Sequence, residues 1–101
     1  MEIKVTHEDG RACFIISGDI DELGAETLER QFRELDKHDV KELVMDFRNV
    51  AYIGSSAIGQ LLLFYKEISL SGGTVRIENA SKELYALLLD LDINKLIQIS
   101  R

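Results

Sequence analysis

The apolar residues of this chain change their spacing several times along the sequence. Ile3 and Val5 alternate with polar neighbours, and an Asp-Gly pair at 9–10, a frequent hairpin turn, precedes a second alternating segment at 12–17. Between residues 21 and 38 the apolar residues recur at helical spacing instead. A chain that switches between a period of two residues and one of about 3.6 alternates strands with helices. This pattern predicts a sheet covered by helices.

The same alternation continues through the rest of the chain. The Leu-Val-Met-Asp-Phe run at 43–47 is predicted to be a buried strand, and the segments at 74–78 and 96–99 further strands. Helices are predicted at 57–69, ended by a Gly-Gly pair, and after Ser81 as the capping residue. The apolar stripes expected to face the core are Ala25, Leu28, Phe32 and Leu35, then Ile58, Leu61, Leu62, Tyr65 and Ile68, and finally Leu84, Leu87, Leu88 and Leu91.

These elements come in the order β-β-α-β-α-β-α-β, with no internal repeat. Strand–helix–strand units that follow a hairpin imply a mixed sheet. We therefore expect an α/β fold with a mixed β-sheet and helices mainly on one face, formed by a single domain of residues 1–101. The strand at 12–17 is apolar on both faces, so we expect it to be central, with Cys13 as a small core residue.

The charge balance narrows the classes of partner. Twelve basic residues against eighteen acidic ones give a net charge of −6, whereas binding to nucleic acid or to an anionic membrane needs a basic surface. An acidic protein is better matched to a protein partner with a basic docking face. The sequence shows no signal-peptide pattern at its start and no apolar run long enough to cross a bilayer, so we expect a cytoplasmic protein.

The segment Asn-Val-Ala-Tyr-Ile-Gly-Ser-Ser-Ala-Ile-Gly at 49–59 places the hydroxyls of Ser55 and Ser56 where a loop meets an apolar helix. A hydrolase elbow, Gly-x-Ser-x-Gly, is a poor match, because Ile58 replaces its last glycine and the two histidines fit no triad. A phosphate-binding loop also fails, since glutamine and leucine replace its lysine and hydroxyl residue. A serine here can cap the helix, or, if phosphorylated, place its phosphate at the helix's free amides. Capping alone would be enough at any helix start.

Three groups of residues resemble the signature of STAS-domain anti-sigma-factor antagonists. They are Asp-Phe-Arg-Asn-Val at 46–50 with Ile53, Ser-Ser-Ala-Ile-Gly at 55–59, and Ser-Gly-Asp-Ile-Asp at 17–21, which is similar to the family's Gly-Glu-Leu-Asp element. The order of elements resembles the family along nearly the whole chain. The combination is specific, whereas each piece alone is weak.

The resemblance implies a partner switch without catalytic residues or cofactors. The unmodified protein would bind an anti-sigma factor, usually a GHKL-type serine kinase, and so release a sigma factor. Phosphorylation of Ser55, with Ser56 as second choice, would switch it off, and a phosphatase would restore it. The partner-binding residues implied by the family's motif are Asp21, Gly54, Ser55, Ser56, Ala57 and Gly59.

Two residues depart from the family's pattern. Gly54 stands where the family usually has aspartate, and Ala57 where glycine is usual. Loss of that aspartate removes a carboxylate that could orient the hydroxyl or bind the kinase, and also removes a like charge beside a future phosphate. The alternative is therefore a non-phosphorylated STAS module that acts as a scaffold, a transporter-associated subunit or a ligand-binding module.

The other titratable residues suggest no site. Asp19, Asp21 and Glu22 lie in one loop without a metal-ligand spacing, so we expect them to cap the following helix rather than to bind a metal. His7 and His38 adjoin predicted turns and are expected to be solvated.

Overall fold

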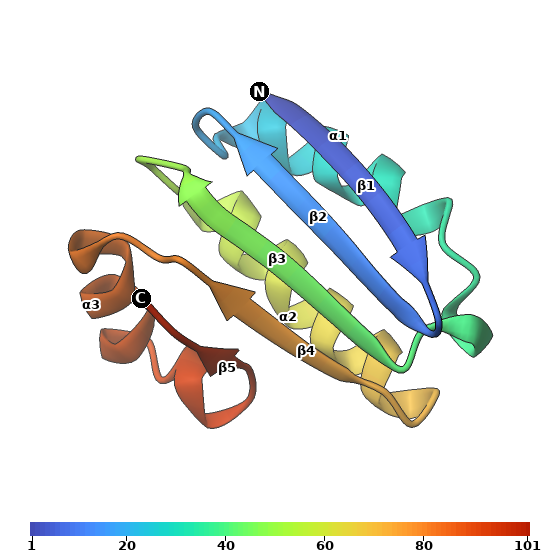
Figure 1. Ribbon diagram of the computed structural model, residues 1–101. Helices are drawn as coiled ribbons and strands as arrows, with labels where there is room; N and C mark the ends of the chain where they lie inside the picture. Colours follow the sequence, from blue (N-terminus) through green and yellow to red (C-terminus); the bar gives the residue numbers. More distant parts are fainter.

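Five strands form one mixed sheet in the computed structural model, which describes residues 1–101 (Figure 1). The order β-β-α-β-α-β-α-β is confirmed. The elements are β1 (Glu2–Glu8), β2 (Arg11–Ser17), α1 (Glu22–Arg33), β3 (Glu42–Asn49), α2 (Ser55–Leu70), β4 (Thr74–Glu78), α3 (Lys82–Asp90) and β5 (Gln98–Ile99), with short 3-10 helices at Lys37–Asp39 and Ile93–Lys95.

The strands lie in the sheet in their chain order. β1 and β2 form the antiparallel hairpin, whose turn has positive φ angles of 51° at Asp9 and 80° at Gly10, as a tight Asp-Gly turn requires. β2, β3, β4 and β5 are parallel neighbours. The predicted mixed sheet is therefore confirmed, with a single antiparallel pair at one edge.

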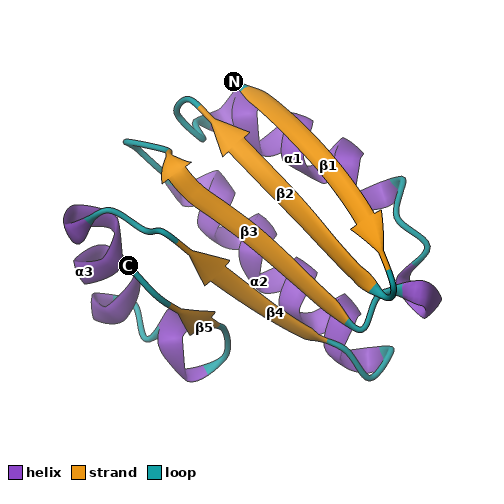
Figure 2. Cartoon of the chain, viewed as in Figure 1, coloured by secondary structure: helices purple, strands orange, loops and turns teal.

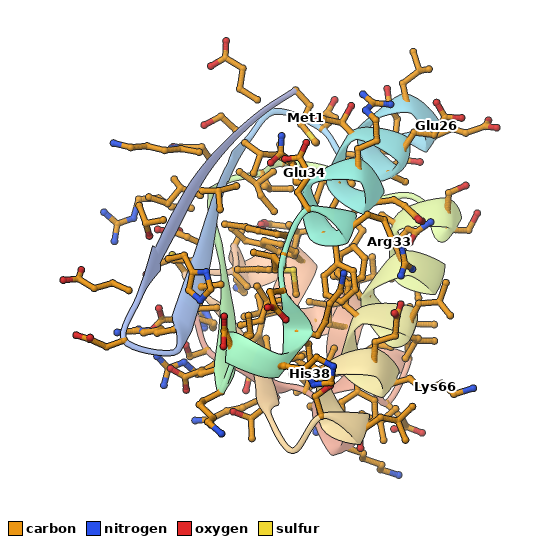
Figure 3. The ribbon with its side chains drawn as sticks, turned by 90° about the vertical axis from the view of Figure 1, so that its right-hand side faces the viewer. Met1, Glu26, Arg33, Glu34, His38 and Lys66 are labelled. Carbon is orange, nitrogen blue, oxygen red and sulfur yellow. The ribbon has the colours of Figure 1, made fainter.

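The helices cover one face of the sheet. Figures 1 and 2 show α1 and α2 side by side behind the strands, and α3 beside the end of β4. Figure 3 shows the side chains that fill the layer between the sheet and these helices. The seam between α1 and α2 is held by stacked rings of Phe32 and Phe64, with centroids 4.0 Å apart. The opposite face of the sheet has no helix over it.

The first helix is shorter than its apolar pattern predicts. It ends at Arg33 instead of continuing to residue 38. Asp36 then caps the separate 3-10 helix by accepting a hydrogen bond from the His38 amide at 3.1 Å. This local bond gives the backbone an alternative to continuing the α-helix.

The buried face of α2 differs from the predicted stripe. The buried residues are Ala57, Leu61, Phe64 and Ile68, whereas Leu62 is exposed and Ile58 and Tyr65 are only half-buried. In α3, similarly, Leu84 and Leu88 are buried, while Leu87 and the C-cap residue Leu91 are exposed. Both helices carry leucine on more than one face, so hydropathy did not identify the side that would meet the sheet.

Cys13 is not a core residue. Its strand lies inside the sheet, but Cys13 and Ile15 point to the face without helices and are half-buried. The pKa of the Cys13 thiol is raised, mainly by its partial burial and to a smaller extent by the nearby carboxylate of Asp46. The thiol therefore stays protonated at neutral pH, and we assign it no reactive role.

Candidate functional site

Two loops meet at the carboxyl end of the parallel strands and fix the start of α2. The Ile20 amide donates to the Tyr52 carbonyl at 2.8 Å, and the Gly54 amide donates to the Ile20 carbonyl at 2.9 Å. Ile20 and Ile53 form an isolated parallel bridge and are both buried. The loop after β2 thus pairs with the loop after β3, and Asp21 is brought to the end of the sheet where α2 begins.

The cap position of α2 is held by Gly54, and Ser55 is the first residue of the helix. No side chain caps this helix, and its first backbone bond runs from the Ile58 amide to the Gly54 carbonyl at 3.2 Å. The amides of Ser55, Ser56 and Ala57 therefore have no protein acceptor. The expectation that a serine caps α2 is wrong, because the residue before the first helical turn is a glycine.

The other two helices do have side-chain caps. Asp21 accepts a hydrogen bond from the Gly24 amide at 2.8 Å, and Ser81 accepts one from the Leu84 amide at 3.1 Å. Asp21 therefore caps α1, as expected of the acidic loop. The side chains of Asp19, Asp21 and Glu22 form no cluster able to hold a metal ion.

Ser55 opens onto an apolar groove between α2 and α3. The groove has a volume of about 310 Å³ and is lined by Ile53, Gly54, Ser55, Ile58, Leu87 and Leu91. Its α3 wall consists of leucines that are 37% and 48% exposed. Exposed apolar side chains around a concavity are typical of a docking site for another protein. The sequence pattern does not reveal this groove, because both leucines fit the apolar stripe that is expected to face the core.

The remaining predicted site residues differ in exposure. Ser56 is exposed but does not line the groove, and Ala57 is buried against the core. Gly59 is exposed one turn into α2, and a Cβ there would meet no atom within 4 Å. The packing inside this protein therefore does not require glycine at position 59, although glycine weakens a helix interior.

Neither histidine lies near the serines. His7 pairs with Ala12 at the start of β2, and His38 belongs to the 3-10 helix before β3. Both are at the amino end of the parallel strands, opposite Ser55; Figure 3 labels His38 there. The structure therefore assembles no serine–histidine pair. None of the α-helices combines the length and hydrophobicity needed to cross a membrane.

Comparison with known proteins gives a consistent family. The family model described as "STAS domain" matches residues 2–101. A protein named "Anti-sigma F factor antagonist" from Paenibacillus polymyxa is 24% identical over 100 residues, which are 98% of this chain and 83% of that protein.

Solved structures share the fold at low sequence identity. A putative anti-sigma factor antagonist from Thermotoga maritima has a TM-score of 0.88 at 16% identity, covering 98% of this chain and 86% of that one. Bacillus SpoIIAA in its phosphorylated form has a TM-score of 0.77 at 13% identity, with coverages of 99% and 92%. A sulfate transporter family protein from Wolinella succinogenes has a TM-score of 0.79 at 17% identity, with coverages of 90% and 76%. With a family model that spans the whole sheet and all three helices, this chain belongs to the STAS domain family.

Proposed function

We propose that this protein is an anti-sigma-factor antagonist that binds an anti-sigma factor through the start of α2 and is switched off by phosphorylation of Ser55. The observation that carries the proposal is the exposed Ser55 hydroxyl at an uncapped helix start, on the rim of an apolar groove. The Paenibacillus relative, named as an antagonist, supports the same role.

The docking surface would combine the groove with the exposed start of α2. An apolar side chain of the partner would enter between Ile58 and the exposed leucines of α3. Exposed acidic residues adjoin the lining residues along the chain: Asp90 lies between the groove leucines Leu87 and Leu91, and Asp19 precedes Ile20, which pairs with Ile53 before the start of α2. Together with the net charge of −6, this distribution favours a partner whose apolar anchor is surrounded by lysine and arginine.

Ser55, rather than Ser56, is the modification site in this proposal. Both hydroxyls are exposed, but only Ser55 lines the groove, so a charge placed on it would lie where the partner docks. Ser56 would carry its charge beside the groove, with less effect on docking.

The modification needs only an acceptor hydroxyl from this chain. The Ser55 oxygen would form a bond to the γ-phosphorus of ATP held by the kinase, while the bond from that phosphorus to the bridging oxygen breaks and ADP leaves. The hydroxyl proton would pass to a base of the kinase. A phosphatase would reverse the change by hydrolysis, in which water supplies the oxygen that leaves with inorganic phosphate.

Phosphate at this position would oppose docking for an electrostatic reason. It adds about −1.5 to −2 charges, which a partner must desolvate when it covers the groove. The free protein tolerates the phosphate, because the unpaired amides of the first turn and the helix dipole favour an anion there. The modification would therefore lower affinity without unfolding the protein.

Intact-mass analysis after incubation with ATP and a candidate anti-sigma kinase tests the proposal. Wild type and Ser56→Ala should each gain one phosphate, and Ser55→Ala should gain none. Modification that persists in Ser55→Ala would overturn the residue assignment. A wild-type protein that binds the anti-sigma factor but is never modified would support the non-phosphorylated STAS module, which the missing carboxylate at Gly54 favours.

A binding measurement tests the switch separately. Ser55→Asp should weaken affinity for the anti-sigma factor about tenfold, equivalent to roughly 1.4 kcal/mol, because one negative charge is then desolvated on docking. Ser55→Ala should bind as wild type does. Equal affinities of all three proteins in titration calorimetry would place Ser55 outside the interface.

A further inference from the structure

Tyr52 lies over the residue that precedes Ser55. Its hydroxyl oxygen is 3.3 Å from the position that a Cβ on Gly54 would occupy, and its ring carbon Cε2 is 3.7 Å from the same point. Backbone hydrogen bonds hold this segment on both sides, since the Tyr52 carbonyl accepts from Ile20 and the Gly54 amide donates to Ile20. The ring is therefore anchored at its base, with its hydroxyl beside the start of α2.

The hydroxyl is available to a ligand. The Tyr52 side chain is 54% exposed, and its hydroxyl makes no hydrogen bond to the protein. The groups beside it at the start of α2 are also donors, because three backbone amides there lack acceptors and the first turn carries no acidic side chain. Asp21, on the neighbouring loop, already accepts a hydrogen bond from the Gly24 amide.

We propose that Tyr52 is a positioning residue for the phosphorylated state, donating a hydrogen bond from its hydroxyl to the phosphate on Ser55. The inference rests on the proposed phosphorylation of Ser55. A phosphate carries three strong acceptor oxygens beyond the serine oxygen, so it extends from Ser55 toward neighbouring donors. A neutral phenol donates without adding charge, and its hydrogen bond favours the dianionic form of the phosphate.

The glycine at 54 is part of the same arrangement. A Cβ at 3.3 Å from the Tyr52 oxygen would be tighter than ordinary contact, so a side chain at 54 would displace the hydroxyl. An acidic side chain there would also place a like charge beside the phosphate. Gly54 therefore leaves the space that the Tyr52 hydroxyl occupies.

The pKa of the second ionisation of phosphoserine reports on this hydrogen bond. Phosphoserine is incorporated at position 55 during synthesis, so no kinase or partner is needed, and its pKa is followed by ³¹P NMR between about pH 4.5 and 8, around the usual value of about 6. Tyr52→Phe should raise this pKa by about 0.5, a roughly threefold gain in proton affinity, because the dianion loses a donor. Gly54→Asp should raise it further.

Two controls separate this role from a structural one. Tyr65→Phe removes a phenol hydroxyl from the far half of α2 and should leave the phosphate pKa unchanged. Thermal melts of unphosphorylated Tyr52→Phe should match wild type. A phosphate pKa that is the same in wild type and Tyr52→Phe would show that Tyr52 does not contact the phosphate. That result would leave the proposed docking and phosphorylation intact, since those are tested with the kinase and the anti-sigma factor.

Discussion

Ser55 begins α2 while Gly54 occupies the cap position. Had the helix begun one residue later, the same hydroxyl could have accepted an amide of the first turn and would have been held in place. In the observed register it is exposed and makes no hydrogen bond. Whether Ser55 caps the helix thus depends on a shift of one residue in where α2 begins. In the structure its hydroxyl is free.

Stability measurements can check this register. Ser55→Ala should change the free energy of unfolding by less than about 0.5 kcal/mol, because an exposed hydroxyl without a partner is lost. Ser81→Ala is the matched control: it removes the cap of α3 and should lower the free energy of unfolding by about 1 kcal/mol. A loss at Ser55 as large as that at Ser81, measured in urea titrations, would show that Ser55 does cap α2.

Gly59 allows a test in which stability and binding change in opposite directions. Gly59→Ala should raise the free energy of unfolding by about 0.5–1 kcal/mol, since glycine weakens a helix interior and the new methyl meets no neighbour. If the partner approaches this exposed turn closely, the same methyl should reduce its affinity. Gly72→Ala is the control. Gly72 has a φ of +84°, which alanine adopts only with strain, so this variant should lower the free energy of unfolding. A more stable variant with unchanged affinity would remove Gly59 from the docking surface.

At the scale of elements, α3 separates a core face from a docking face. Leu88 is fully buried, whereas its neighbour Leu87 is 37% exposed on the groove wall. The sequence placed both on one stripe because both fit helical spacing. Their actual roles depend on how α3 sits beside the start of α2, which hydropathy does not encode.

This division predicts different outcomes for the same substitution at adjacent positions. Leu88→Asp should lower the free energy of unfolding by several kcal/mol, because it buries an unpaired carboxylate. This is a large share of the about 5–15 kcal/mol that stabilises a typical domain. Leu87→Asp should melt close to wild type but bind the anti-sigma factor more weakly. Circular dichroism melts and titration calorimetry measure the two effects. A Leu87→Asp protein that unfolds as readily as Leu88→Asp would mean that the groove is closed in solution.

The outer seam between α1 and α2 contains a two-bond ion pair. Arg33 donates to both carboxylate oxygens of Glu67, at 2.8 and 2.7 Å, and also to Glu29; Figure 3 shows Arg33 between the two helices. The hydrogen bond from Arg33 lowers the pKa of Glu67. A carboxylate with a lowered pKa in the folded state stabilises the fold above its unfolded pKa, and this contribution is lost as pH falls through the folded value.

Glu67→Gln should therefore lower the free energy of unfolding only at pH values where the Glu67 carboxylate of the wild type is ionised. At pH 7 the variant should be about 0.2–1 kcal/mol less stable than wild type, a modest loss because the pair is solvent-accessible. The difference should shrink as pH falls below about 4, near the unfolded pKa of glutamate. Glu26→Gln, at an exposed position of α1, is the control. Urea titrations between about pH 3 and 7 compare the free energies of unfolding of the variants and the wild type. A difference between Glu67→Gln and wild type that does not change with pH would show that the ion pair with Arg33 is not its cause.

At the scale of the whole molecule, the two faces of the sheet have different environments. One face packs against α1 and α2, and the other carries a network of partly exposed ion pairs among Arg11, Glu42, Arg76 and Glu78. Cys13 lies on that second face, which explains why its apolar strand pattern did not make it a core residue. The candidate site lies at neither face but at the carboxyl end of the strands, where loops from β2 and β3 meet α2.

The sequence by itself determined the order of strands and helices, the Asp-Gly turn, the capping of α1 by its acidic loop and the capping of α3 by Ser81, because each depends on side chains within a few positions of one another. It also determined that two serines stand at the start of α2. Tertiary structure decided which faces of α2 and α3 are buried, since both helices carry leucines on more than one face and only packing against the rest of the fold selects a side. It also formed the groove beside Ser55 and placed Tyr52 over Gly54, because these contacts join side chains whose meeting depends on the packing of loops and helices.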